Sequence, residues 1–306
     1  YKMKTEKFKK NIPLLYANQM LGKNITTPII ILYYLQYGLN FAQIGIITAV
    51  AQISNAVLEI FGGIFADLYG KKLSQIIYSI LRMVNMLILL FGNSFGWFVT
   101  ASLFYGIALG MGSGTQHSLL FDTLKVLEKE EEHKKHRGRL RFAIKTFNSL
   151  AILAIPLLYT YHIKIPFLIG FVFYFIAFIV ALFFEEPFII EKTEQKIQQV
   201  FQKISSSFKE IFSSHKNIFI ILMESIIWSF VLVSFDYFQP LLKSIGLSVA
   251  VFGVIYFAAK FFEGLGSALV HPLSRYFSNN KFLFLIVLLV SASFVGIYSN
   301  IGFLII

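Results

Sequence analysis

Long apolar runs separated by short polar segments dominate the chain. Most of these runs reach the roughly 20 residues that an α-helix needs to cross a bilayer. They lack the apolar–polar alternation of transmembrane β-barrel strands. We therefore predict an all-α polytopic membrane protein with about nine transmembrane helices. The predicted spans are 12–35, 41–66, 73–91, 97–121, 142–161, 165–184, 218–242, 248–270 and 282–306.

Composition supports this fold class and argues against enzymatic chemistry. The chain is 57% hydrophobic and 14% charged, whereas a soluble domain is about 25% charged. It has no cysteine, which excludes disulfides, thiolate metal sites and cysteine nucleophiles. G-x-S-x-G, H-E-x-x-H and Walker A motifs are absent from the sequence. We expect no enzyme activity, no metal site and no cofactor.

The net charge of +11 follows the membrane topology and does not indicate a nucleic-acid partner. Most of the 27 Lys and Arg residues fall in segments 2–10, 71–72, 125–145 and 192–216. The loops expected on the other side carry only Lys164 and Lys243. Because Lys and Arg accumulate in cytoplasmic loops, the predicted location is the cytoplasmic membrane with the N-terminus inside.

The turn between the second and third spans carries Gly63, Asp67, Gly70, Lys71 and Lys72. Glycine allows close helix approach and the positive φ of a tight reversal. An aspartate here is able to accept hydrogen bonds from the free N–H groups of a neighbouring helix start and to pair with a base. As a loop taken alone, the segment is also typical of a tight helix hairpin.

These five residues resemble the signature G-x-x-x-D-x-x-G-[RK]-[RK] of the loop between helices 2 and 3 in the major facilitator superfamily. The resemblance implies that they form a gating latch, which biases the balance between outward-open and inward-open states. We expect Asp122, at the exit of the fourth span, to pair with a basic residue near this latch.

An internal repeat relates residues 38–47 to 246–255 at an offset of 208. The family resemblance implies two six-helix halves, of which the second is incomplete in this sequence. The expected parts are an N-terminal half (1–186), a cytoplasmic amphipathic linker (187–215) and a partial C-terminal half (216–306). Helices 10–12 are expected beyond this sequence, so the chain is interpreted as C-terminally truncated.

Charged and polar residues inside the spans are functional candidates, because a charge near the bilayer centre is costly unless it lines a cavity or has a partner. Lys23 and Lys260 are expected near the midplane, where they suit an anionic group of a substrate. The alternatives are a carboxylate partner or snorkelling. The candidates for substrate or ion coupling are Lys23, Glu59, Arg82, Gln116, Glu224, Asp236, Lys260 and Glu263.

Several of these candidates have a second interpretation. Glu59 and Arg82 fall at similar depth and favour a structural or gating ion pair over substrate contact. Glu224 and Glu263 share a depth, and either suits a transported proton if burial raises its pKa. Asp236 suits an outer gate or a solvated rim equally well.

The resemblance implies a secondary active transporter that moves a small organic solute or drug-like compound by alternating access. The expected partners are membrane lipid, the small-molecule substrate and a coupling ion, H⁺ or Na⁺, around a monomer. The fifth span lacks the G-P-x-x-G-G pattern of many drug/proton antiporters, which argues against that subclass. The alternative is a non-transporting membrane sensor or partner-binding protein on the same scaffold.

Overall fold

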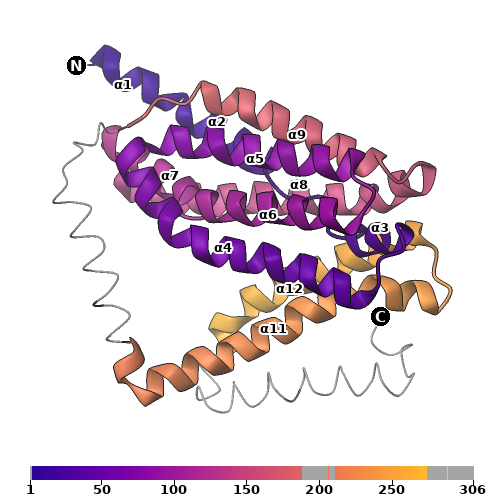
Figure 1. Cartoon of the computed structure of the whole chain (residues 1–306). Coiled ribbons are helices and arrows are strands. Elements are labelled where there is room, and N and C mark those ends of the chain that lie inside the picture. The colour runs from indigo at the N-terminus through magenta and orange to yellow at the C-terminus, as the bar shows by residue number, and fades with distance from the viewer. Residues whose placement is uncertain (1, 188–205, 207–210, 274–287, 289–306) are drawn as a thin grey trace.

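The computed structural model of the chain describes residues 2–187, 206, 211–273 and 288 (Figure 1). Within these residues the ordered elements are all helical. They are α1 (Lys2–Lys9), α2 (Asn11–Leu21), α3 (Ile30–Gln36), α4 (Phe41–Tyr69), α5 (Lys71–Phe91), α6 (Phe95–Gly112), α7 (Thr115–Val126), η1 (Glu130–Glu132), α8 (His133–Tyr161), α9 (Ile165–Leu182), α11 (His215–Ser244) and α12 (Val249–Leu273).

Six stretches of the described chain are long and apolar enough to cross a membrane: α4, α5, α6, η1 with α8, α9 and α11. This confirms the predicted all-α polytopic fold. The last predicted span, 282–306, and most of the expected linker, 187–215, lie outside the described residues.

The predicted first span is interrupted. Helix α2 ends at Leu21 and α3 begins only at Ile30. In between, the Asn24 side-chain oxygen accepts hydrogen bonds from the backbone N–H (3.2 Å) and the hydroxyl (2.9 Å) of Thr26. Such local bonds offer the backbone an alternative to the helix ladder, and Pro28 follows without an N–H to give.

Two further predicted boundaries differ from the structure. The predicted span 97–121 is divided at Ser113 and Gly114 into α6 and α7. The basic segment before the predicted span 142–161 belongs to the same helix, because α8 starts at His133. That helix also runs through Pro156 without ending, since neighbouring helices compensate for the missing N–H of a proline in a membrane bundle.

Helices α4 and α6 approach each other through glycines. A Cβ atom placed on Gly62 would lie 2.3 Å from the Gly110 carbonyl oxygen, and one on Gly106 would lie 2.2 Å from the Ala51 carbonyl oxygen. Only a residue without a side chain permits this backbone contact. Gly106 and Gly110 of α6 thus form the surface that packs closely against α4.

The internal repeat is visible in the backbone. Gly38 and Gly246 both have positive φ, 79° and 85°. The same two hydrogen bonds precede the following helix in each copy: Gly38 N–H to Leu35 O (3.0 Å) and Leu39 N–H to Tyr34 O (3.3 Å) correspond to Gly246 to Lys243 (3.1 Å) and Leu247 to Leu242 (3.2 Å). Helices α4 and α12 then start at equivalent residues, Phe41 and Val249.

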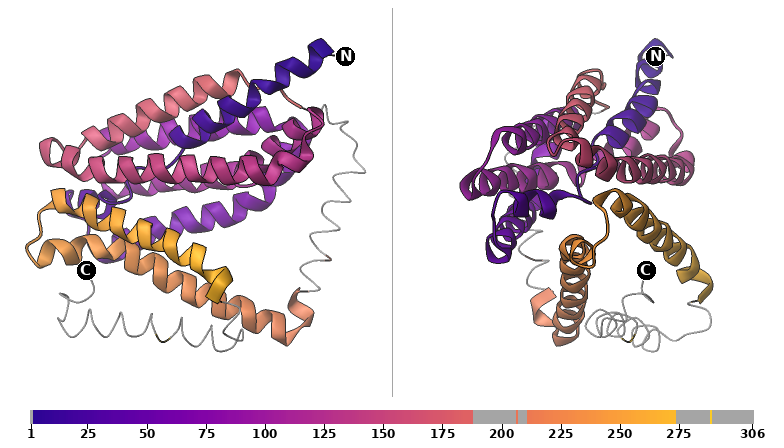
Figure 2. Two further views of the ribbon diagram at one scale, coloured as in Figure 1. Left: turned by 180° about the vertical axis from the view of Figure 1, so that it is seen from behind. Right: turned by 90° about the vertical axis from the view of Figure 1, so that its right-hand side faces the viewer.

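Helices α11 and α12 meet the preceding helices near one end of the bundle. In Figures 1 and 2, α4 and α11 converge toward α3 and diverge toward the other end, which carries the α4–α5 turn, α7 and η1. We call the latter the basic end, after Lys71, Lys72 and the segment 125–145. At the opposite end the Tyr237 hydroxyl donates to the Phe41 carbonyl oxygen (3.2 Å).

Gly62 and its neighbour Gly63 provide a matched test of the α4–α6 contact. A Cβ atom on Gly63 would meet no atom within 4 Å. We expect Gly62→Ala to lower the free energy of unfolding by about 1–3 kcal/mol through overpacking. Gly63→Ala should leave it unchanged or raise it slightly, because alanine is the better helix former. Thermal unfolding of the purified protein in detergent measures both, and equal melting temperatures for the two variants would contradict the packing described.

Candidate functional site

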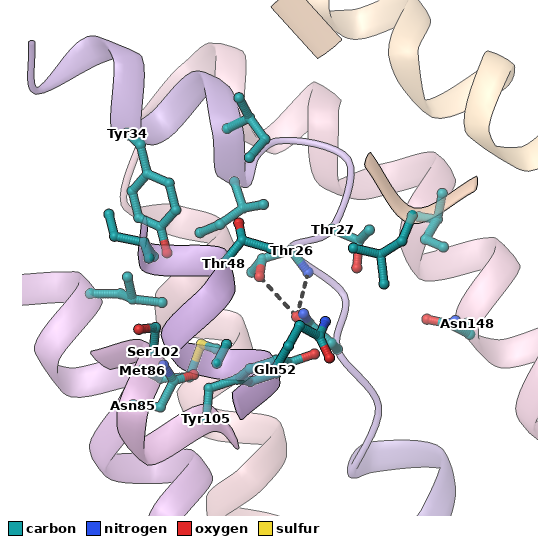
Figure 3. Close-up of a pocket in the computed structure, with 18 of the residues that line it drawn as sticks. Thr26, Thr27, Tyr34, Thr48, Gln52, Asn85, Met86, Ser102, Tyr105 and Asn148 are labelled. Carbon is teal, nitrogen blue, oxygen red and sulfur yellow. Dashed lines mark hydrogen bonds between the residues drawn. The ribbon is translucent and has the colours of Figure 1, made fainter. Parts of the chain in front are cut away.

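The described helices form two groups, an N-terminal group from α2 to α9 and a second group of α11 and α12. A cavity of about 630 Å³ lies between these two groups (Figure 3). Its polar lining consists of amides, hydroxyls and one amine, from Asn24, Thr26, Thr27, Tyr34, Thr48, Gln52, Asn85, Ser102, Tyr105, Asn148 and Lys260. Its apolar lining includes Ile31, Ile47, Met86, Leu89, Ile152, Trp228 and Leu232. Among the residues that define this lining there is no Asp or Glu. Such a pocket, mostly apolar with a few convergent polar groups, suits a small organic molecule that carries both apolar and polar parts.

The break in the first span forms one wall of this pocket. Asn24, Thr26 and Thr27 lie in the non-helical segment and line the cavity. Figure 3 shows Thr26 with its two hydrogen bonds beside Thr48 and Gln52 of α4. Irregular backbone is tolerated at membrane depth where it is buried in protein or lines a cavity.

Gln239 of α11 closes the same break from the other group of helices. This fully buried side chain donates from Nε2 to the Thr27 carbonyl oxygen (2.7 Å). Its Oε1 accepts from the backbone N–H groups of Ile31 (3.1 Å) and Leu32 (3.4 Å) at the start of α3. We call this set of bonds the Gln239 clamp. At the repeat offset of 208, Gln239 is the counterpart of Ile31, so the clamp lies where the pseudo-two-fold axis of the repeat is expected.

Behind the pocket wall lies Arg82, at the middle of α5 and only 1% exposed. Its Nη2 donates to the Tyr174 hydroxyl. The guanidinium stacks over the rings of Tyr105, at 4.3 Å, and Tyr174, at 4.5 Å. Its Nε and Nη1 have no hydrogen-bond partner among the described residues. Aromatic faces and a hydroxyl thus take the place that a carboxylate would normally have.

The predicted ion pair between Glu59 and Arg82 is wrong. Glu59 is exposed, and the described residues bring no carboxylate within ion-pair distance of Arg82. Glu59 shares a helix face with Thr48 and Gln52 of the pocket lining, because positions 4 and 11 residues apart recur on one side of a helix. Equal depth in two adjacent spans did not reveal that the two side chains point in different directions.

The remaining candidates for substrate or ion coupling differ in how close they lie to the pocket. Lys260 lines the pocket, and Lys23 is half-buried next to the lining residue Asn24. Glu224 is exposed and lies one turn before Trp228 on α11. The side chains of three candidates, Gln116, Asp236 and Glu263, lie outside the described part of the chain.

The predicted latch is a tight reversal at the basic end. Gly70 has φ +100° and joins α4 to α5 without an intervening loop. The Glu186 carboxylate accepts the first N–H groups of α5, from Lys71 (3.1 Å) and Lys72 (2.8 Å). The acceptor at this helix start is therefore Glu186 and not Asp67, which is exposed and makes no hydrogen bond within the described chain.

Two side-chain contacts connect this reversal to its surroundings. The Lys71 ammonium forms an ion pair with Asp122 of α7, with only 10% and 16% of the two side chains exposed. Asn11 of α2, which is fully buried, donates to the Thr123 hydroxyl (3.2 Å) and the Glu185 carbonyl oxygen (2.8 Å). Helices α2, α5 and α7 and the end of α9 are thereby held together at the basic end.

Sequence reasoning missed Gln239, Glu186 and Tyr174. A single amide in a long apolar run, followed by Pro240, is a signal that would have marked Gln239 for attention. Glu186 offers no local signal, because its partners lie 115 and 114 residues away. Tyr174 is one of 15 tyrosines in the sequence, and its pairing with Arg82 appears only in the fold.

The arrangement is that of a multi-pass helical membrane protein with a pocket between two groups of its helices. Residues 14–300 match the family model described as Major Facilitator Superfamily. The chain belongs to this superfamily of membrane transporters.

Individual relatives agree with this assignment. The chain is 28% identical over 173 residues to the Bacillus subtilis (strain 168) protein named as an uncharacterized MFS-type transporter YxaM, covering 56% of this chain and 42% of that protein. It is 30% identical over 105 residues to the quinolone resistance protein NorA of Staphylococcus aureus, covering 33% and 27%. The match thus spans less than half the length of each curated relative.

Solved structures show the same fold at low sequence identity. The nucleoside transporter NupG (D323A mutant) matches with a TM-score of 0.74 and 11% identity, covering 88% of this chain and 69% of that one. The D-xylose-proton symporter matches with a TM-score of 0.62 and 16% identity, covering 86% and 69%. At these identities the likeness concerns the fold alone.

Glu185 and Glu186 form a natural pair for testing the latch geometry. We expect Glu186→Ala to lower the free energy of unfolding by about 1 kcal/mol, because the α5 N–H groups lose their acceptor. Glu185→Ala should have little effect, since Glu185 bonds to the Asn11 side chain through its backbone C=O and N–H only. Thermal unfolding of both variants in detergent provides the measurement. A loss of stability in Glu185→Ala equal to that in Glu186→Ala would contradict the capping role.

Proposed function

We propose that this protein is a secondary active transporter that moves a small organic solute across the cytoplasmic membrane by alternating access. The observation that carries the proposal is the position of the pocket. It takes its lining from the first-span break, α3–α6 and α8 on one side and from α11 and α12 on the other. A solute bound there touches both groups of helices, so rocking of one group against the other would change the side from which it is reached.

The contacts between the two groups support a specific state. The Gln239 clamp and the Tyr237–Phe41 contact both lie at the end opposite the basic end. We take the basic end as cytoplasmic, because it gathers Lys and Arg. The described arrangement then corresponds to a transporter closed outside and open inside, with the N-terminus in the cytoplasm.

We assign the parts of the transporter as follows. Residues 1–186 form the N-terminal half, 187–215 a linker and 216–306 part of the C-terminal half. Gly63, Asp67, Gly70, Lys71, Lys72 and Asp122 form the latch that biases closure of the basic end. The Lys71–Asp122 pair supports this role. Removing one partner of a buried ion pair strongly destabilises a protein, so the intact pair favours one arrangement of α5 and α7.

The coupling ion is assigned to carboxylates near the pocket. Glu224 is our candidate for a transported proton, because it lies one turn from the lining residue Trp228 and is exposed. A drug-like substrate is one class consistent with the similarity to the quinolone resistance protein. The missing G-P-x-x-G-G pattern favours a different small organic solute.

Alternating access can be tested without knowing the substrate, because the 306 residues contain no cysteine. We expect Gln52→Cys, in the pocket lining, to react with a membrane-impermeant maleimide added from either side of the membrane. Ile53→Cys is the matched control: its side chain is 64% exposed but does not line the pocket, so lipid should protect it.

A cross-link across the opposite end sharpens this test. Phe41→Cys and Tyr237→Cys replace two rings whose centroids lie 5.6 Å apart. Linking them should stop labelling of residue 52 from the outer side and leave labelling from the cytoplasmic side. Labelling from one side only, in the protein without the cross-link, would contradict alternating access and favour a non-transporting sensor.

A further inference from the structure

The N-terminal group of helices buries positive charge without a carboxylate to balance it. Arg82 is 1% exposed, and two of its nitrogen atoms, Nε and Nη1, lack a partner within the described chain. No ion pair joins it to a described Asp or Glu. A charge held near the middle of a membrane span is costly, and such residues normally serve a substrate or ion pathway.

Lys23 adds a second positive charge to the same place. The Tyr174 hydroxyl, which accepts from Arg82, donates to the backbone carbonyl oxygen of Lys23 (3.2 Å). The two cations are close enough for their charges to repel each other. Lys23 takes part in no ion pair among the described residues. An anion placed between them would remove this repulsion and supply the missing hydrogen-bond acceptor.

This cationic pair is the layer directly behind the pocket wall. Arg82 stacks on Tyr105, and one turn further along α5 lies Asn85; both line the pocket. Lys23 is followed by the lining residue Asn24. The Tyr105 ring therefore lies between the guanidinium and the pocket.

The rest of the lining offers hydrogen-bond acceptors for the donor groups of a solute. Asn85 and Asn148 each keep a buried side-chain oxygen without a hydrogen-bond donor in the described chain. Among the described residues the lining has no carboxylate, and Lys260 contributes a further amine from α12. Glu59 on α4 and Glu224 on α11, two described carboxylates near lining residues, are exposed and lie outside the lining.

We infer that the transported solute is a small organic anion that carries hydroxyl groups, and that its carboxylate or phosphate group binds between Arg82, Tyr105 and Lys23. The amides and hydroxyls of the pocket take the remainder of the molecule. This inference rests on the proposed transport function and names the substrate class of the same pocket. Arginine suits this role because its fixed fork of donors matches the geometry of a carboxylate or phosphate.

Two pairs of solutes that differ in charge test the inference on the purified full-length protein. Gluconate and glucose share a hydroxylated six-carbon skeleton, and glycerol 3-phosphate and glycerol share a three-carbon one. We expect at least one anion to raise the thermal unfolding temperature and to bind about tenfold or more tightly than its neutral counterpart. A preference in the first pair alone indicates a carboxylate, and one in the second pair alone indicates a phosphate.

Substitutions locate the effect. Lys23→Gln should weaken binding of the preferred anion about tenfold, and Arg82→Lys should keep part of the affinity that Arg82→Gln loses. Lys243→Gln is the matched control, because it removes the same charge from an exposed site outside the pocket. Lys23→Gln keeps the test valid if Arg82→Gln does not fold.

Equal binding of charged and neutral solutes, binding of none of the four, or anion binding unaffected by both Lys23→Gln and Arg82→Gln would overturn the inference. Its failure can be distinguished from failure of the proposed function. Labelling of Gln52→Cys from both sides, together with no preference for anions, would remove the substrate class and leave alternating access standing.

Discussion

The break in the first span imposes the constraint on which the rest of the structure depends. Backbone polar groups released inside a membrane find no water, so protein groups must satisfy them. Three neighbouring side chains do so: the Tyr78 hydroxyl donates to Gly22 O (2.6 Å), the Tyr174 hydroxyl donates to Lys23 O (3.2 Å), and Gln239 bonds across the break. Within the break, Asn24 accepts from Thr26. The helices α5, α9 and α11 are thus each tied to one short segment.

This constraint explains why the pocket, the Gln239 clamp and the basic residues Lys23 and Arg82 lie close together. The unwound residues present Asn24, Thr26 and Thr27 to the cavity, and the same stretch receives the Gln239 clamp from the second group of helices. A change of state that separates the groups at this end must free the N–H groups of α3 or offer them another acceptor. In the proposed transport cycle, the substrate, water or a neighbouring side chain would fill that role.

The sequence was sufficient for the features with local signals, and insufficient for those that depend on distant partners. Apolar run lengths predicted the membrane spans, and the glycine of the latch indicated the positive φ seen at Gly70. The repeat predicted equivalent turns at Gly38 and Gly246. The break between α2 and α3 was not predicted, although Lys23, Asn24, Thr26 and Thr27 interrupt the apolar run there. Pro28 alone suggests only a kink. Glu186 at the start of α5 and Tyr174 beside Arg82 are set by packing between segments about a hundred residues apart.

The Gln239 clamp holds the two groups of helices together at the end opposite the basic end. The most direct measurement is the distance across that end by double electron–electron resonance, with spin labels at Ala42→Cys and Lys243→Cys, two exposed positions. In an otherwise unchanged protein we expect a short distance to predominate. Replacing Gln239 with leucine, which keeps the bulk and removes the hydrogen bonds, should add a longer-distance population, and Gln36→Leu, outside the clamp, should not. An unchanged distance distribution in the Gln239→Leu protein would contradict the account.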